Sequence, residues 1–305
     1  MKGIVLRSTG SFYDVLAPNG DTVVCKVRGK IRLEGIKETN PVAVGDRVEF
    51  ETINDIGSIT EILPRDNHIL RQSVKKTGHA HVLAANVDQV MLVVTLAFPR
   101  TSLGFIDRFL VTAESFRIPQ VLVFNKLDMM GEEEIAFQNT IVEVYKKIGV
   151  ACYVLSALQD ADLSQIHEVL AGKTTLIAGH SGVGKSTLLN KLSPDIIQKV
   201  GEVSDFSSKG THTTTFAEMF PLNSETYVID TPGVKEWGLI DMSQQELSDY
   251  FPEMRDRRLE CKFNSRCIHM NEPKCAIKDA VGKGEIAMSR FDSYLSMLMA
   301  EDQYR

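Results

Sequence analysis

The sequence predicts an α/β protein in three parts: an N-terminal β-barrel, a central parallel sheet covered by helices, and a C-terminal helical module around a cysteine and histidine cluster. The first 70 residues hold five short β-rich stretches separated by turn signals, which is typical of a small barrel. From Val87 onward, buried strands alternate with helices, which predicts a mainly parallel sheet. Three cysteines and one histidine lie close together near the C-terminus. We expect domains at residues 1–70, 71–243 and 244–305.

The composition is that of an ordinary globular protein, with 43% hydrophobic and 24% charged residues in a chain of 305. No apolar run reaches the roughly 18 residues of a transmembrane helix, and the start of the chain does not resemble a signal peptide. We therefore expect a cytoplasmic protein without a membrane anchor, and a monomer. The net charge of −6 argues against bulk nonspecific binding of nucleic acid but allows a local basic face.

The β-rich stretches of the first part are residues 4–7, 12–16, 22–27, 47–52 and 57–62. Five strands in this length predict an OB-fold barrel, a fold that often binds oligonucleotides. Around the third strand, Lys26, Arg28, Lys30 and Arg32 occupy alternate positions and share one face if the chain is extended. Two interpretations stay open, a solvated strand face and a stripe that contacts RNA phosphates. Residues 64–86, rich in turn and loop signals, are expected to be a linker.

The central part has predicted strands at residues 90–94, 121–124, 152–155, 174–178 and 226–229, with helices at 105–116, 132–148, 163–170 and 186–192. The carboxyl ends of parallel strands meet at one edge of their sheet, where such sheets bind ligands. The sequence motifs of this part all follow strand ends, so we expect them to gather at one site.

Residues 179–186 read GHSGVGKS and fit the phosphate-binding loop pattern G-x-x-x-x-G-K-[ST], between a buried strand and a helix. The glycines let backbone N–H groups approach a polyphosphate, and the N-terminus of the following helix also points at it. Lys185 reaches the β- and γ-phosphates and is expected to be catalytic, while the Ser186 hydroxyl can ligate Mg²⁺. The expected phosphate-binding residues are Gly179, His180, Ser181, Gly182, Val183, Gly184, Lys185, Ser186 and Thr187.

A second motif, N-K-x-D, indicates that the nucleotide carries guanine. Asp128 can accept hydrogen bonds from guanine N1–H and the N2 amine, and adenine offers neither donor there. Asn125 can donate to the other base edge and tie loops together, and the Lys126 stem can lie along the base. At the next strand end, Ser156 and Ala157 can offer backbone N–H groups to guanine O6.

Two later segments are typical of a magnesium-dependent switch. Asp230, in the sequence DTPG, can hold Mg²⁺ through water, and the Gly233 N–H can sense the γ-phosphate. The preceding threonine run, THTTT at residues 211–215, also offers a ligand for Mg²⁺. Either Thr213 or Thr214 can complete the magnesium shell, and we favour Thr214.

The order of these motifs is a circular permutation. Most small GTPases have the phosphate loop first and N-K-x-D later, whereas here N-K-x-D precedes the phosphate loop, the threonine run and DTPG. With the barrel and the cysteine cluster, the chain resembles the RsgA (YjeQ) family of small-subunit-dependent GTPases. The resemblance implies an OB barrel, a permuted GTPase domain and a zinc domain. It also implies hydrolysis of GTP to GDP and phosphate, stimulated by the 30S ribosomal subunit, in late small-subunit maturation.

The residue after DTPG is Val234, where Ras-like enzymes carry a glutamine that orients the attacking water. Valine has no group for this task, so we expect slow intrinsic hydrolysis and a replacement from elsewhere. His212, in the threonine run, is the best candidate of this chain. The alternative is that His212 only packs or contacts the partner.

Near the C-terminus, Cys261, Cys267, His269 and Cys275 form the pattern C-x5-C-x-H-x5-C. Three thiolates and one imidazole make a closed tetrahedral set for a structural zinc ion. Nearby arginines and lysines make the region basic, so it is a second candidate for RNA contact. Residues 285–299 have helical spacing of apolar side chains and are expected to pack back on the body.

Two rival functions use the same phosphate loop. A nucleotide kinase would share the loop, but N-K-x-D and DTPG argue against it, and no acceptor site is visible. A non-enzymatic RNA-binding module would keep GTP only as a structural ligand. GTP turnover measured with and without 30S subunits distinguishes the three hypotheses.

Overall fold

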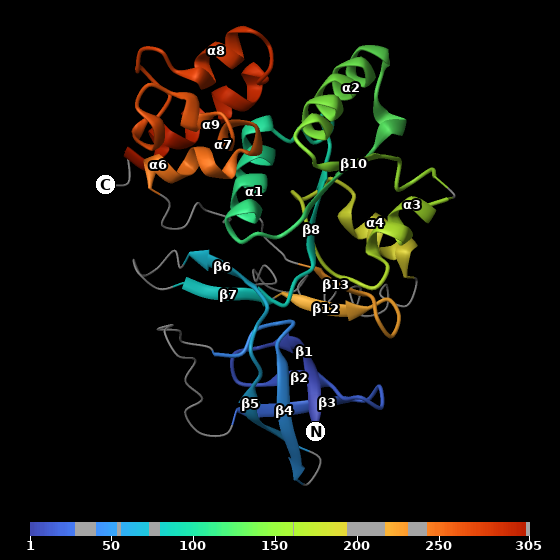
Figure 1. The fold of residues 1–305 in the computed structure, drawn as a ribbon. Coiled ribbons are helices and arrows are strands. Elements are labelled where there is room, and N and C mark those ends of the chain that lie inside the picture. Colours follow the sequence, from blue (N-terminus) through green and yellow to red (C-terminus); the bar gives the residue numbers. More distant parts are fainter. Residues whose placement is uncertain are drawn as a thin grey trace.

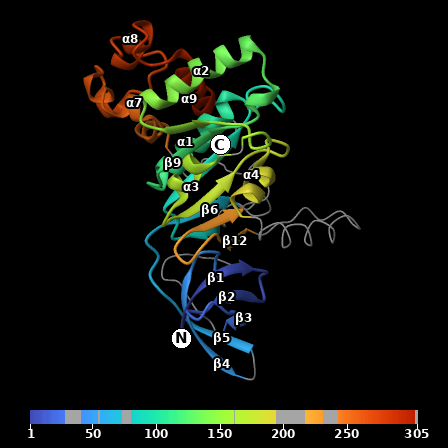
Figure 2. The ribbon, with the colours of Figure 1, turned by 90° about the vertical axis from the view of Figure 1, so that its right-hand side faces the viewer.

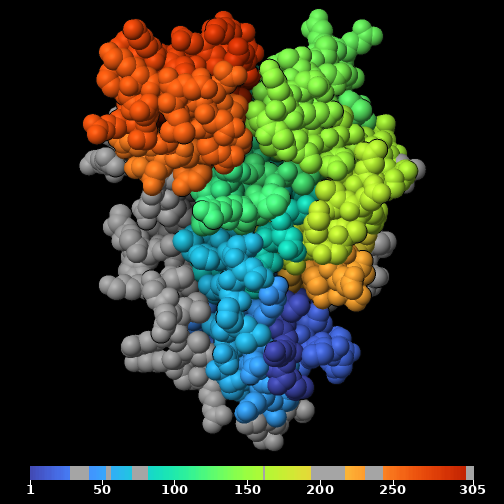
Figure 3. All heavy atoms as spheres, in the orientation of Figure 1, coloured from blue at the N-terminus to red at the C-terminus, as the bar shows by residue number. Residues whose placement is uncertain are grey.

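The computed structural model describes residues 1–27, 41–53, 56–72, 80–160, 162–193, 217–230 and 243–302. It confirms the predicted α/β fold class with its three parts. The barrel forms one end of the molecule, the sheet with its helices forms the middle, and the C-terminal helical module lies at the other end (Figure 1). In the space-filling view the module lies beside helix α2, away from the barrel (Figure 3).

The N-terminal strands close into a five-stranded barrel. β1 pairs with both β2 and β4, and β3 pairs with β5, so the order β1-β2-β3-β5-β4 returns to its start. Inward-facing residues from each strand, such as Val15, Cys25 and Ile59, fill the interior of the barrel. This confirms an OB-like barrel. The strands are β1 (Lys2–Ser8), β2 (Tyr13–Leu16), β3 (Thr22–Val27), β4 (Arg47–Ile53) and β5 (Ile56–Ile62).

The central strands β8 (Gln89–Val94), β9 (Gln120–Phe124), β10 (Ala151–Val154), β11 (Thr174–Ala178) and β13 (Tyr227–Asp230) are parallel. Their order is β10-β9-β8-β11-β13, so the strand before the phosphate loop lies inside the sheet although it comes fourth in sequence. The antiparallel strand β12 (Glu218–Pro221), which the sequence analysis missed, follows β13.

Helices cover both faces of this sheet, as expected for strands buried on both sides. β8 is buried along its whole length, with Val90, Leu92 and Val94 facing one core and Met91 and Val93 facing the other. Side chains of α1 and α2 fill the first core, and those of α3 and α4 fill the second. The helices are α1 (Leu103–Ser115), α2 (Glu132–Lys147), α3 (Ser164–Leu170) and α4 (Lys185–Leu192).

The prediction of a linker at residues 64–86 was wrong. β6 (His68–Gln72) and β7 (Ala80–Ala85) form a two-stranded antiparallel sheet. Ile69 and Ala84 are buried against the central core, so the hairpin owes its place to tertiary packing. Short alanine side chains give no strand signal in a sequence, which is why the turn residues dominated the prediction.

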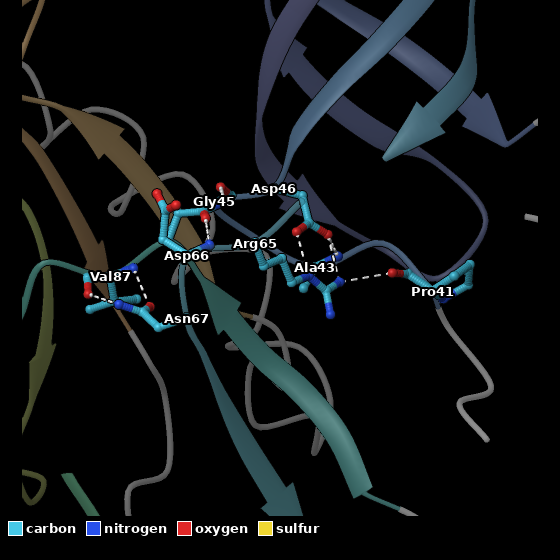
Figure 4. Close-up of polar contacts among 9 residues, drawn as sticks. Pro41, Ala43, Gly45, Asp46, Arg65, Asp66, Asn67 and Val87 are labelled. Carbon is cyan, nitrogen blue, oxygen red and sulfur yellow. Dashed lines mark hydrogen bonds and ion pairs between the residues drawn. The ribbon is translucent and has the colours of Figure 1, made fainter. Parts of the chain in front are cut away.

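β1 of the barrel also pairs with β12, with Arg7 opposite Glu218, so the barrel and the central strands share one continuous sheet (Figure 2). A buried ion pair strengthens this joint. The Arg65 guanidinium contacts Asp46 through Nε at 2.7 Å, and Asp46 is fully buried (Figure 4). Arg65 also donates to the Pro41 carbonyl oxygen at 2.9 Å (Figure 4).

Backbone contacts complete the joint between barrel and sheet. Asn67 exchanges two hydrogen bonds of 2.8 Å with the backbone of Val87 (Figure 4). The Asn86 amide donates to the Gly45 carbonyl oxygen at 2.9 Å. Gly45 has φ +86°, and a Cβ there would lie 2.1 Å from the Ala85 carbonyl oxygen. The two chain segments approach so closely that only glycine fits.

The C-terminal module is a compact set of short helices with its own core. The predicted terminal helix is α9, and it packs against α1. Phe291 and Tyr294 of α9 lie in a core that includes Val111 of α1. Among the described residues, no helix is both long and apolar enough to cross a membrane. The helices are α6 (Gln244–Leu247), η3 (Ser248–Tyr250), α7 (Pro252–Arg255), η4 (Arg258–Glu260), η5 (Asn264–Arg266), α8 (Ala276–Gly282) and α9 (Met288–Asp302).

Candidate nucleotide site and metal centre

The phosphate-loop segment connects β11 to α4, as the sequence predicts. Its glycines are required by close approach. A Cβ on Gly179 would lie 2.5 Å from the Val93 carbonyl oxygen, and one on Gly184 would lie 2.2 Å from Asn125 Nδ2. Gly184 also has φ +93°. The loop is therefore pressed against the carboxyl ends of β8 and β9, where a larger side chain has no room.

Asn125 joins two loops of the site. It is buried, its Nδ2 donates to the Val183 carbonyl oxygen at 2.8 Å, and its Oδ1 accepts the Ala157 N–H at 2.7 Å. The tie between loops that we expected of Asn125 is thus present. Lys126 has φ +65°, a left-handed conformation that turns the chain sharply at the end of β9.

Ser156 has a role that sequence reasoning missed. Its hydroxyl donates to Asp128 Oδ1 at 2.5 Å and so orients the carboxylate that is predicted to read guanine. The backbone N–H of Ser156 donates to Asp160 Oδ2 at 2.7 Å, and that of Ala157 donates to Asn125. Both amides have protein partners here, so donation to guanine O6 would require an exchange of partners.

Lys185 and Asp230 lie together, with Nζ of the lysine 2.5 Å from Oδ1 of the aspartate. Asp230 ends β13 opposite Ile177 of β11, which brings it beside the phosphate-loop strand. Ser186 and Thr187 begin α4 next to Lys185. The structure therefore gathers a cation, a carboxylate and a hydroxyl where phosphates and Mg²⁺ are expected.

Several predicted residues lie outside the described parts of the chain. These are Arg28, Lys30 and Arg32 of the basic stripe, and His212, Thr213, Thr214, Gly233 and Val234 of the switch segments. Lys26 is described. It lies in β3, and its Nζ is 4.8 Å from the centroid of the Phe12 ring.

The cysteine and histidine cluster forms as predicted. The ligand atoms of Cys261, Cys267, His269 and Cys275 all lie within 4.8 Å of one another, and all four residues are buried. The Sγ atoms of Cys261 and Cys275 are 3.9 Å apart, and His269 Nδ1 lies 3.6 and 3.4 Å from them. A tetrahedral zinc ion with ordinary bond lengths sets its ligands about 3.6–3.8 Å apart. The donor set and its spacing fit zinc.

The ionisation of the cluster also fits metal binding. Burial lowers the pKa of His269 to about 4, so the imidazole is neutral at pH 7 and its ring nitrogen can act as a ligand. Burial raises the pKa of the Cys267 thiol to about 12, so the metal must displace a proton to bind the thiolate. The Tyr294 hydroxyl of α9 donates to the Ile268 carbonyl oxygen at 2.8 Å and ties that helix to the cluster.

Comparisons with known proteins agree with this architecture. The RsgA N-terminal domain model matches residues 2–59, and the RsgA GTPase model matches residues 62–240. The chain is 48% identical to the Small ribosomal subunit biogenesis GTPase RsgA of Bacteroides fragilis, covering 100% of this chain and 99% of the relative. It is 47% identical to the protein of the same name from Christiangramia forsetii, covering 100% and 98%.

Solved structures share the fold of this chain over nearly its whole length. YjeQ from Thermotoga maritima superposes with a TM-score of 0.78 at 35% identity, covering 98% of this chain and 97% of that one. YloQ, described as a circularly permuted GTPase, superposes with a TM-score of 0.76 at 30% identity, covering 100% and 96%. The chain belongs to the RsgA GTPase family and is a GTP hydrolase with a circularly permuted GTPase domain.

Proposed function

We propose that this GTPase binds the 30S ribosomal subunit and hydrolyses GTP to GDP and phosphate late in small-subunit maturation, with the subunit stimulating turnover. The names of the relatives support a role with the small ribosomal subunit. The observation that carries the nucleotide part is the buried Asn125, which links the phosphate loop to the loop that holds Asp128 in place.

In the proposed site, Asp128, Asn125 and Lys126 recognise guanine. Ser156 holds the Asp128 carboxylate in place. A base without matching donors would cover this carboxylate without pairing with it, which is how hydrogen-bonded sites discriminate. Residues 179–184 and the start of α4 surround the phosphates with backbone N–H groups. Lys185 supplies a positive charge to the β- and γ-phosphates.

Ser186, Thr214 and Asp230 are the proposed magnesium ligands, Asp230 through water. The ion, when bound, neutralises charge on the phosphate oxygens. The Gly233 N–H is the proposed sensor of the γ-phosphate. Ser186 and Asp230 are on adjacent elements of the described chain, which supports their share of this assignment.

Val234 has no group that orients water, so we assign this role to His212. Its replacement by alanine should leave GTP affinity unchanged and lower the turnover measured with 30S subunits, because only a transition-state contribution is lost. Normal stimulated turnover of His212→Ala would exclude the catalytic role and favour packing or partner contact.

The cysteine and histidine cluster is proposed to hold one structural zinc ion, with no open ligand position for catalysis. The barrel stripe Lys26, Arg28, Lys30 and Arg32 is proposed to contact rRNA phosphates. A protein that works on ribosomal subunits belongs in the cytoplasm, and we propose that it acts as a monomer.

Turnover with purified 30S subunits tests the proposal. We expect phosphate release from GTP to be slow with the protein alone and to rise by at least about tenfold with 30S subunits, since Val234 leaves a gap that the subunit must help to fill. Lys185→Ala should abolish the stimulated rate. Equal rates with and without subunits would contradict the proposal.

A further inference from the structure

Helix α1 is buried on two sides. One stripe faces the central sheet, and it consists of Ile106, Phe109, Leu110 and Ala113. A second stripe, Asp107, Val111 and Glu114, recurs at positions i, i+4 and i+7 and faces the C-terminal module. Figure 1 shows α1 between β8 and the helices of the module. The helix is thus shared between the nucleotide domain and the module.

A buried ion pair fixes the second stripe. The Arg290 guanidinium of α9 contacts Asp107 Oδ1 at 2.7 Å and Glu253 Oε1 at 2.7 Å. The Tyr145 hydroxyl donates to the same Asp107 oxygen at 2.9 Å, and the Arg290 side chain is 2% exposed. Because no water is available to replace a lost partner, the pair holds α1 and α9 in one relative position.

The same interface holds an apolar contact and a second, exposed ion pair. Val111 of α1 is fully buried in the core of the module, in the same hydrophobic cluster as Phe251 and Tyr294. Further along α1, Arg255 contacts Glu114 Oε1 at 2.8 Å, with side chains that are 48% and 26% exposed. An exposed pair of this kind contributes little to stability, which makes Arg255 a matched control for Arg290.

The opposite end of α1 contacts the phosphate loop. The Phe105 ring lies 3.9 Å from the His180 imidazole, measured between ring centroids, with 35° between the planes. The segment that leads into α1 lies there too, since a Cβ on Gly182 would be 3.5 Å from Pro99 Cγ. A backbone hydrogen bond links the two ends of this segment, since the Thr101 N–H donates to the Thr95 carbonyl oxygen at 2.8 Å.

We propose that α1 couples the C-terminal module to the phosphate loop, with Phe105 as the residue that positions His180. Phe105 and Asp107 are two residues apart on one rigid helix, so the ion pair that places Asp107 also places the Phe105 ring. Displacement of the module by a partner therefore changes the packing under the phosphate loop, and the bound nucleotide affects the module to the same degree. This inference rests on the proposed assignment of residues 179–186 to phosphate binding.

The test measures dissociation of a fluorescent GDP analogue from the full chain. Phe105→Ala and Arg290→Lys should each raise the dissociation rate about fivefold or more, within the usual range of coupling between sites. Phe105→Tyr keeps the ring and should restore the wild-type rate. Arg255→Ala, the control in the same interface, should stay within about twofold of wild type.

The double variant Phe105→Ala/Arg290→Lys decides between coupling and two independent effects. If the module acts through Phe105, the double variant dissociates GDP no faster than Phe105→Ala alone. Rates that multiply would overturn the proposal, and so would a folded Arg290→Lys with the wild-type rate. If Arg290→Lys does not fold, Val111→Ala weakens the same interface and replaces it in this comparison of single and double variants.

Hydrogen exchange gives a second readout that needs no turnover. Amides of residues 179–184 should exchange faster in Arg290→Lys than in wild type, and Arg255→Ala should match wild type. Equal exchange in all three proteins would contradict the coupling. Failure of the proposed nucleotide site is separate, because it would appear as unchanged GDP affinity in Lys185→Ala.

Discussion

At the scale of single residues, the proposed recognition of guanine depends on how Asp128 is held. The motif N-K-x-D predicts which side chains read the base, and the structure adds the Ser156 hydroxyl that fixes the carboxylate. No sequence pattern links Ser156 to Asp128, because the contact joins the ends of two different strands, β9 and β10.

Replacement of Asp128 by asparagine should weaken GTP binding by about 10- to 100-fold, since the carboxylate pairs with two donors of guanine. An amide can donate to the additional carbonyl of xanthine, so preference should move toward XTP. Competition binding with GTP, ATP and XTP measures this change. Unchanged preference for GTP would remove Asp128 from the base site.

Ser156→Ala should cause a smaller loss of GTP affinity and keep the preference for GTP, because it only releases the Asp128 carboxylate from its hydrogen bond.

A second residue-scale feature is Gly45 in the joint between barrel and sheet. Alanine at this position combines a left-handed φ of +86° with a Cβ only 2.1 Å from the Ala85 carbonyl oxygen. We expect Gly45→Ala to lower the free energy of unfolding by about 2 kcal/mol or more, measured by urea denaturation.

Gly20 is the matched control for this substitution. It has φ +89° but nothing within 4 Å of an added Cβ, so Gly20→Ala should cost only the conformational strain, about 1 kcal/mol. Similar losses for the two variants would show that the close approach of the two segments has no energetic weight.

At the scale of elements, we propose that the C-terminal module depends on a bound metal. Its helices are short, from three to fifteen residues, and the cysteine and histidine cluster forms part of its small core. Bound zinc would supply much of the folding free energy of such a module. The spacing of Cys261, Cys267, His269 and Cys275 predicts the cluster, but only the structure shows that α9 is anchored to it through Tyr294.

Removal of the metal should therefore unfold the module first. We expect Cys267→Ser, or treatment with a strong chelator, to lower the melting temperature of the module and to increase hydrogen exchange in residues 243–302. Cys152→Ser is the control, since Cys152 lies in β10 away from the cluster and should leave metal content at one ion per chain. Full metal content in Cys267→Ser, or none in wild type, would contradict the proposed zinc site.

At the scale of the whole molecule, the sequence predicts the parts better than their connections. Repeated strand and helix patterns, the motif order and the cysteine spacing were sufficient for the barrel, the permuted domain and the module. The hairpin of β6 and β7, the strand β12 and the double burial of α1 were missed. Each depends on contacts between distant segments, such as Arg290 with Asp107, and local periodicity carries no information on these.

The contacts that join the barrel and the C-terminal module to the central domain also bear on how the molecule can respond to nucleotide. The barrel shares a sheet with the strands next to Asp230, and the module shares α1 with the phosphate loop. Both of the proposed RNA-binding parts are therefore in contact with elements of the proposed nucleotide site. Since coupling between two ligands is reciprocal, a subunit that favours GTP must itself be favoured by GTP to the same degree.

The most direct test of this reciprocal coupling measures the affinity of the protein for purified 30S subunits. The affinity is compared between the GDP-bound protein and the protein bound to a non-hydrolysable GTP analogue. We expect tighter binding with the analogue, by about fivefold or more, and an equal increase in affinity for the analogue when subunits are present. Equal affinity for 30S subunits in the two nucleotide states would contradict a GTP-controlled action on the small subunit.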